Sequence, residues 1–169
     1  VKDQFDRNTV LDLVKVKEKI VPVGRLDMYT SGALLLSNDG EFINKLTHPS
    51  FEIEKTYNVT IKGVITSEEI DKLKAGVEID NNGETYLTKP AKAKILKTDE
   101  LKQISRVQIT IHEGKNREIR KVMQFLGYQV NKLIRISYAG INLDNLNTGE
   151  VKEIKIPQKI FSKFIKSES

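Results

Sequence analysis

The strongest constraint on the fold of this chain is a polar bend, residues 24–32, followed directly by an apolar run, residues 33–36. The bend contains Arg25 and Asp27, and Thr30–Gly32 connects it to the run Ala33–Leu36. An apolar run of this length, closed by the turn residues Asn38–Gly40, predicts a short strand buried on both faces. If the bend is extended, the side chains of Arg25 and Asp27 share one face of the chain. The sequence therefore predicts a carboxylate and a guanidinium held together beside a buried strand.

Helix and strand signals follow one another irregularly along the chain. The patterns predict helices over residues 10–14, 41–46, 66–76, 117–126 and 158–166. They predict further strands over residues 54–62, 77–79, 85–87, 91–96, 104–112, 133–137, 140–143 and 151–156. Because no regular alternation of strand and helix appears, the predicted fold class is α+β, with a largely antiparallel mixed sheet and flanking helices.

Three local signals support these boundaries. Asp39 precedes the helix over residues 41–46 and predicts its N-cap. Thr66 and Glu69 have the spacing of a capping box, which opens the next helix. The turn Asn81–Gly83 between two short apolar segments predicts a hairpin.

Composition limits the class of protein and the kinds of site. The 169 residues fit a single domain, and 38% hydrophobic with 30% charged residues is typical of a soluble globular protein without a membrane span. Cysteine is absent, which excludes disulfides and thiolate metal sites and suits the cytoplasm. His48 and His112 lie far apart, and we expect a structural role for each, so the sequence predicts no metal site.

Positive charge gathers toward the C-terminus. Residues 101–169 hold 13 basic and 6 acidic side chains, which favours a polyanionic partner, because neutralised phosphates release counterions. A lysine-rich surface without a partner is the alternative. Arginine supplies only 6 of the 28 basic residues, and Arg25, Arg117 and Arg120 lie in two short segments. The rigid guanidinium fork suits a carboxylate or a phosphate, so this placement indicates that geometry matters there.

Asp27 is the strongest candidate for a reactive group. An aspartate beside an arginine stays ionised near neutrality even when partly buried, and such a carboxylate can attack a sugar or remove its proton. Taken alone, such a pair is more often a structural Arg–Asp contact that holds the bend. Tyr57, on the predicted strand over residues 54–62, can stack on a base drawn from its own stack. The alternative for Tyr57 is an ordinary packing position in a strand.

The next candidate group lies at the start of the helix over residues 117–126. At 100° per residue, one face of this helix carries an apolar stripe made of Ile119, Val122, Met123 and Leu126. Arg117 and Lys121 lie on the opposite face, while Arg120 lies at the edge, from which it can reach a partly buried carboxylate. An amphipathic helix with a solvated basic face is the alternative.

Together these segments resemble the pseudouridine synthases, in particular the RsuA/RluB-type enzymes that modify single uridines in bacterial ribosomal RNA. Three segments carry the resemblance in the right order, namely Gly24–Asp27 with Thr30–Gly32, Glu54–Tyr57, and Glu113–Lys121. The similarity extends over most of the chain, including residues 9–13, 47–49, 134–136 and 146–149.

The resemblance implies an isomerase that flips a specific uridine of ribosomal RNA out of its stack and converts it to pseudouridine, without a cofactor. It implies catalytic roles for Asp27, Tyr57 and Arg120. Asp27 attacks C1′ or abstracts the 2′ proton, and both routes stay open. Tyr57 stacks on the uracil and Arg120 pairs with Asp27. The positions implied to bind RNA are Arg25, Lys115, Asn116, Arg117 and Lys121.

The resemblance also bears on organisation and partners. Members of the family usually carry an N-terminal S4-type RNA-binding domain and an opening strand that ends in a Lys-Pro-x-Gly turn, and neither is found here. We therefore expect residues 1–169 to be a catalytic domain trimmed at its N-terminus. We expect ribosomal RNA as the partner, with a slight preference for the large subunit. We also expect a cytoplasmic monomer that does not associate with membranes.

Two other functions fit parts of the pattern. A non-catalytic RNA-binding or ribosome assembly module of the same fold would bind RNA and leave it unchanged. A base-releasing glycosylase would liberate free uracil, but glycoside hydrolysis usually needs two carboxylates. Only Asp27 is well placed, since Asp39 is explained as a turn and cap residue. The isomerase is therefore the favoured reading.

Overall fold

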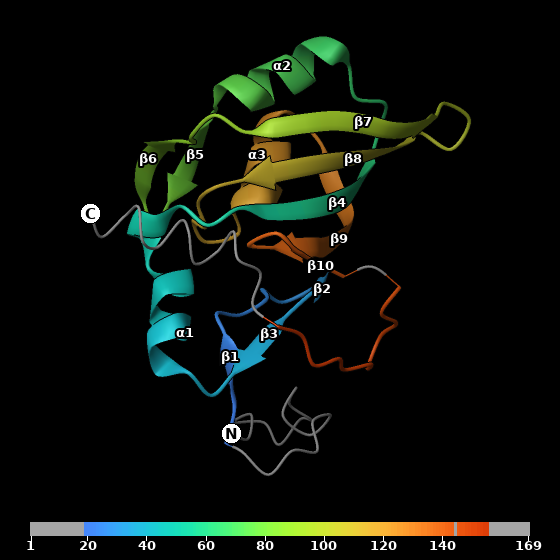
Figure 1. Ribbon diagram of the computed structural model, residues 1–169. Helices are drawn as coiled ribbons and strands as arrows, with labels where there is room; N and C mark the ends of the chain where they lie inside the picture. The colour runs from blue at the N-terminus through green and yellow to red at the C-terminus, as the bar shows by residue number, and fades with distance from the viewer. Residues whose placement is uncertain (1–18, 144, 156–169) are drawn as a thin grey trace.

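A six-stranded sheet organises the protein, whose computed structural model describes residues 19–143 and 145–155 (Figure 1). The order is β10–β9–β4–β8–β7, and β2 pairs with β9 outside this path. The strands are β2 (Thr30–Gly32), β4 (Lys55–Lys62), β7 (Lys92–Asp99), β8 (Ile104–Ile111), β9 (Gln129–Tyr138) and β10 (Ile141–Asn142). Only the β2–β9 pairing is parallel within this sheet. The predicted α+β fold with a largely antiparallel mixed sheet is confirmed.

Two short ribbons accompany the sheet. β1 (Val21–Val23) pairs with β3 (Leu35–Ser37), and β5 (Glu78–Asn81) pairs with β6 (Glu84–Leu87), all antiparallel. The β5–β6 turn holds Asn82 at φ 54° and Gly83 at φ 90°, as a type I′ turn requires, so the predicted hairpin is confirmed.

Helices α1 and α2 begin where the capping signals predict, whereas α3 begins after Arg117 without a side-chain cap. They are α1 (Gly40–Thr47), the 3₁₀ turn η2 (Pro49–Phe51), α2 (Ser67–Ala75) and α3 (Glu118–Phe125). Asp39 accepts the Phe42 N–H at 3.1 Å, and Thr66 and Glu69 form the reciprocal capping box. In the described part of the chain, none of these helices is long and apolar enough to cross a membrane.

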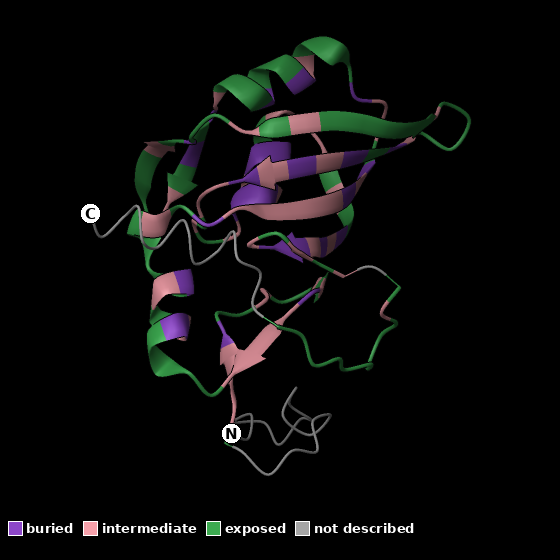
Figure 2. Cartoon of the chain, in the orientation of Figure 1, coloured by how far each residue is buried: buried purple, intermediate pink, exposed green. Residues whose placement is uncertain are grey.

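The larger core lies where α2 and α3 pack against the sheet and the β5–β6 ribbon (Figure 2). The predicted stripe on α3 faces it, with Ile119, Val122 and Met123 buried and Leu126 half-buried. Fully burying a side chain of this kind contributes about 1.5–3 kcal/mol, so the stripe holds α3 firmly on the sheet. A second, smaller cluster joins α1 to β1 and β9 through Val23, Phe42, Leu46, Ile53 and Tyr138. Because the stripe on α3 is buried, the first turn of this helix has a fixed position relative to the sheet.

The apolar run at residues 33–36 is not the doubly buried strand that its composition predicts. β2 ends at Gly32, β3 begins at Leu35, and only Ala33 is buried while residues 34–36 are half-buried. The reason is that β3 has a single partner, β1, in a two-stranded ribbon, so the strand is not covered on both faces.

Two other predictions need correction near the C-terminal end. β9 begins at Gln129, earlier than the predicted start at Leu133, because its polar first residues pair with the end of β4. Residues 151–155 form no strand and are exposed, since no neighbouring strand of the described residues pairs with them. The predicted helices over residues 10–14 and 158–166 lie outside the described residues. So does residue 156, the last residue of the predicted strand over residues 151–156.

Candidate active site

The loop between β1 and β2 carries Asp27. Arg25 is exposed, Asp27 is half-buried, and the Thr30 N–H donates to the Asp27 carbonyl at 2.9 Å, which closes a turn. Gly32, at the end of β2, pairs with Arg135 of β9, and the Ala33 N–H donates to the Arg135 carbonyl at 2.7 Å. The Asp27 loop is thus anchored to β9 at its C-terminal end.

Tyr57 reaches the same place from the middle of the sheet. It lies on β4 at an irregularity in the pairing between β4 and β9, opposite Arg135. Burial raises the pKa of the Tyr57 hydroxyl, the Arg135 guanidinium lowers it in part, and the negative charge of Asp27 raises it further. The charges of Asp27 and Arg135, which lie on two other elements, thus both act on Tyr57.

Arg120 approaches Asp27 from the first turn of α3. Its Nη2 donates to the carbonyl of Tyr29 at 2.7 Å, so the side chain ties the helix to the Asp27 loop. Burial and the charge of Arg117 lower the pKa of Arg120, while Asp27 raises it. Among the described residues, no ion pair within 4.0 Å joins Asp27 to Arg120 or to Arg25. The Arg120 Nε is buried without a hydrogen-bond partner there, so this guanidinium keeps a free donor at the site.

Arg135 is a site residue that the motifs alone did not identify. It is only 3% exposed, its Nε donates to the Ala33 carbonyl at 2.9 Å, and its guanidinium carbon lies 4.6 Å from the centre of the Tyr138 ring. Its Nη2 is buried and has no partner among the described residues. The available signal was an arginine flanked by Leu133, Ile134 and Ile136 in a predicted strand, because a buried cation needs a functional or structural reason.

The predicted RNA-binding residues surround the start of α3. Asn116 is exposed, and Lys115, Arg117 and Lys121 are half-buried. The Lys115 ammonium lies 4.8 Å from the centre of the Tyr86 ring, and Arg117 has a left-handed backbone with φ 54°. These cations flank Arg120, while Arg25 adds another on the Asp27 loop.

Both histidines have structural partners, as predicted. His48 Nδ1 accepts the Ser50 N–H at 3.2 Å and caps η2, and its ring packs edge-on against Phe51. His112 Nε2 lies 3.3 Å from a carboxylate oxygen of Glu54. Within residues 19–143 and 145–155, no group of three or more His, Cys, Asp or Glu side chains could hold a metal ion.

Glu118 is a buried carboxyl next to the site. It is 5% exposed, and its Oε1 accepts the Lys115 N–H at 3.2 Å. Burial raises the pKa of Glu118 to about 8, with a further contribution from the neighbouring Glu113 carboxylate and a partial offset from Lys55. Burial likewise lowers the pKa of Lys55. The Glu118 side chain also fixes the loop before α3 by accepting the backbone hydrogen bond of Lys115.

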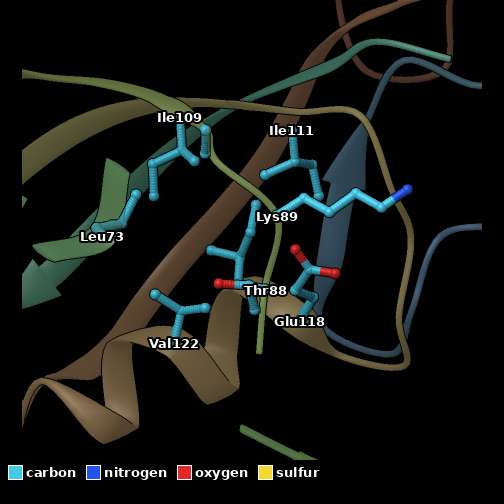
Figure 3. Close-up of a pocket in the computed structure, with 9 residues that line it drawn as sticks. Leu73, Thr88, Lys89, Ile109, Ile111, Glu118 and Val122 are labelled. Atoms are coloured by element: carbon cyan, nitrogen blue, oxygen red, sulfur yellow. The ribbon is translucent and has the colours of Figure 1, made fainter. Parts of the chain in front are cut away.

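A small, mainly apolar pocket opens beside Glu118 between α2, β8 and α3 (Figure 3). Leu73, Ile109 and Val122 line its interior, and the Glu118 carboxylate lies at one end. None of Asp27, Tyr57 or Arg120 lines it. The pocket is thus part of the packing behind the candidate site rather than the site itself.

Replacing Glu118 with Gln is expected to stabilise the protein, with a gain that grows as pH rises. The folded protein keeps the Glu118 proton up to about pH 8, whereas the unfolded chain loses it near 4.5, so the parent loses stability through this window. Gln keeps the acceptor for Lys115 and cannot ionise. Urea unfolding across the window should show a gain of a few kcal/mol at its upper end. A constant difference between the two proteins would contradict the raised pKa.

Comparison with known proteins decides the family. Residues 2–125 match the sequence model described as RNA pseudouridylate synthase. The chain belongs to the RNA pseudouridylate synthase family. The resemblance predicted from the sequence is therefore confirmed.

Two relatives of this RNA pseudouridylate synthase family member have names that state an activity. The chain is 46% identical over 153 residues to "Ribosomal large subunit pseudouridine synthase B" of Bacillus subtilis, covering 90% of the chain and 61% of that protein. It is 34% identical over 167 residues to "Ribosomal large subunit pseudouridine synthase E" of Vibrio vulnificus, covering 92% of the chain and 69% of that protein. The chain thus spans about six-tenths of the length of its Bacillus relative.

A solved structure supports the same family assignment. The "Crystal structure of pseudouridylate synthase" superposes with a TM-score of 0.79 at 30% identity, covering 94% of this chain and 66% of that one. The likeness to this solved structure supports the α+β fold seen in the described residues.

Proposed function

We propose that this chain isomerises a specific uridine of ribosomal RNA to pseudouridine, with residues 1–169 forming the catalytic domain. The observation that carries the proposal is the hydrogen bond from Arg120 of α3 to the Tyr29 carbonyl in the Asp27 loop, together with the charge of Asp27 acting on Arg120 and on Tyr57 of β4. A carboxylate, an aromatic ring and a cation with a free donor form a suitable set for glycosidic chemistry on a flipped nucleotide. Family membership supports the same reaction.

In the proposed reaction the N1–C1′ bond breaks, the uracil turns within the site, and a C5–C1′ bond forms. The hydrogen on C5 leaves to solvent as a proton and N1 takes up a proton in exchange, so the product is an isomer of uridine. If Asp27 attacks C1′, its bond to C1′ forms as N1–C1′ breaks, and it breaks again as C5–C1′ forms. If Asp27 instead removes the 2′ proton, that proton returns to C2′ as C5–C1′ forms. Tyr57 stacks on the base, while Arg120 stabilises the charge on Asp27 and holds its loop. The reaction needs no cofactor, because the same base leaves and returns.

The proposed partner is ribosomal RNA, preferentially that of the large subunit. The names of the Bacillus and Vibrio relatives support this choice. The proposed RNA contacts come from the Asp27 loop and from the loop and first turns of α3, namely Arg25, Lys115, Asn116, Arg117 and Lys121. We propose that the protein acts as a monomer in the cytoplasm.

Release of tritium from ribosomal RNA labelled at uridine C5 tests the proposal. The substrate would be unmodified large-subunit RNA, with small-subunit RNA as the matched comparison, and free uracil would be measured in the same samples. Release from the large-subunit RNA without free uracil is the expected result. Free uracil would identify a glycosylase, binding without release would identify a non-catalytic module, and release from small-subunit RNA alone would reverse the subunit assignment.

Replacing Lys115, Arg117 and Lys121 together with Ala is expected to weaken RNA binding and to flatten its dependence on salt. Each phosphate contact that is lost should reduce the slope of log affinity against log salt by about one. Filter binding between about 50 and 200 mM salt measures this slope.

The matched control replaces three exposed lysines of β7, which lies at the far edge of the sheet from β2 and β9. These are Lys92, Lys94 and Lys97. The control removes the same number of charges, so its slope should stay close to that of the parent. Equal slopes for the two triple variants would remove the start of α3 from the RNA interface.

A further inference from the structure

Two large apolar side chains beside Asp27 are left without packing partners in the core. Met28 is 61% exposed and Tyr29 is 82% exposed, and both directly follow the candidate catalytic aspartate. Scattered exposed apolar residues are common, but two in succession beside a reactive group mark a candidate contact surface.

The backbone holds Tyr29 in a conformation that few tyrosines adopt. Asp27 to Thr30 form a turn closed by a 2.9 Å hydrogen bond, with Met28 and Tyr29 at its central positions. Tyr29 has φ 68°, and a positive φ at the third position is what a type II turn requires. Gly or Asn usually supplies it, so a tyrosine here carries strain, and such strain gathers at functional sites.

Arg120 fixes the turn that bears this ring. Its Nη2 donates to the Tyr29 carbonyl at 2.7 Å, and its charge interacts with that of Asp27. The same arginine therefore places the candidate reactive carboxylate and the exposed ring relative to each other. Any RNA strand that brings a uridine to Asp27 must pass close to Tyr29.

We propose that Tyr29, with Met28 beside it, is a stacking platform for the nucleotide next to the target uridine. The proposal rests on the proposed function, because it takes the RNA strand to lie across Asp27. When a nucleotide is flipped out, its neighbour loses a stacking partner, and an aromatic ring replaces that contact for any base. Arg117 at the N-cap of α3 and Arg120 in its first turn supply cations where the phosphates of the same strand would pass.

A tryptophan at position 29 tests the platform directly, because the chain contains no other tryptophan. The Tyr29→Trp protein would be titrated with unmodified large-subunit ribosomal RNA while its fluorescence is recorded. Saturable quenching at the midpoint found by filter binding is the expected result. Unchanged emission while RNA binds would overturn the proposal. The same variant would also be titrated with ribosomal protein that is free of RNA. A change of its emission in that titration, with no change in the RNA titration, would also overturn the proposal.

Leu101→Trp provides the matched control, since Leu101 is 99% exposed and lies in the turn between β7 and β8. Its emission should not change when RNA binds. Equal quenching of both tryptophans would overturn the proposal, because the effect would then not be local to the Asp27 loop.

Tyr29→Asn removes the ring and keeps a residue that tolerates a positive φ, so the turn should persist. We expect KM for tritium release to rise about tenfold, as for the loss of one stacked base, with a much smaller change in kcat. Tyr29→Phe should recover most of the loss, because it restores the ring without the hydroxyl. An unchanged KM in Tyr29→Asn would overturn the platform. If the parent binds RNA but releases no tritium, the proposed function fails while the fluorescence titration still decides the platform.

Discussion

Asp27→Asn is expected to lower the rate of tritium release by about a thousandfold or more, while RNA binding stays close to that of the parent. The amide has almost the same size as the carboxylate, and the backbone hydrogen bond from Thr30 to residue 27 is unaffected. It lacks the negative charge needed to attack C1′ or to remove the 2′ proton. Single-turnover tritium release and filter binding on the same preparations measure the two properties.

Asp39→Asn is the matched control for this substitution. It makes the same chemical change at the N-cap of α1, where Asp39 accepts the Phe42 N–H and where Asn also caps well. Activity and stability should stay near the parental values. If Asp27→Asn retained the parental rate, another group would have to carry the chemistry.

Gly32→Ala is expected to reduce both stability and activity severely. Gly32 has φ 116°, and a Cβ atom added there would lie 2.1 Å from the carbonyl oxygen of Arg135. The obstacle is backbone, so β2 must separate from β9. We expect a loss of about 2–4 kcal/mol in the free energy of unfolding, from the clash and from the unfavourable backbone conformation. Activity should fall with it, because β2 anchors the loop of Asp27. Urea unfolding and tritium release measure the two effects.

Gly40→Ala is the control for this prediction. Gly40 is the first residue of α1, its backbone does not have a positive φ, and an added Cβ would meet nothing within 4 Å. Its unfolding free energy should change little. A Gly32→Ala protein as stable as the parent would show that the close contact of β2 with β9 is not required.

The sequence predicted those parts of the fold that depend on neighbouring residues. The capping box of Thr66 and Glu69 and the turn at Asn82 are set within four residues, and both are present as predicted. The stripe on α3 follows from helical periodicity alone. The length of β9 did not follow, because its first residues are polar and become a strand only through pairing with β4.

Some residues of the candidate site could likewise be predicted from the sequence and others could not. Asp27, Tyr57 and Arg120 were predicted because each lies in a short segment that resembles the family, although each residue alone fitted a structural role at least as well. Arg135 was not, since its position depends on β9 lying between β4 and β2, which no local pattern specifies. The run Ala33–Leu36 was misjudged for a related reason, because an apolar run does not show how many partner strands will cover it.

The parallel contact of β2 with β9 also has a consequence for the order of events during synthesis. Ser31 pairs with Ile134, so the ends of the described chain must meet before the Asp27 loop is anchored. Contacts between residues so distant in sequence form late, because the intervening chain must first be ordered. A nascent chain that ends before β9 therefore contains Asp27, but it lacks the strand that anchors the Asp27 loop. On the proposed function, competence to modify RNA should appear only when almost all of the sheet has been made.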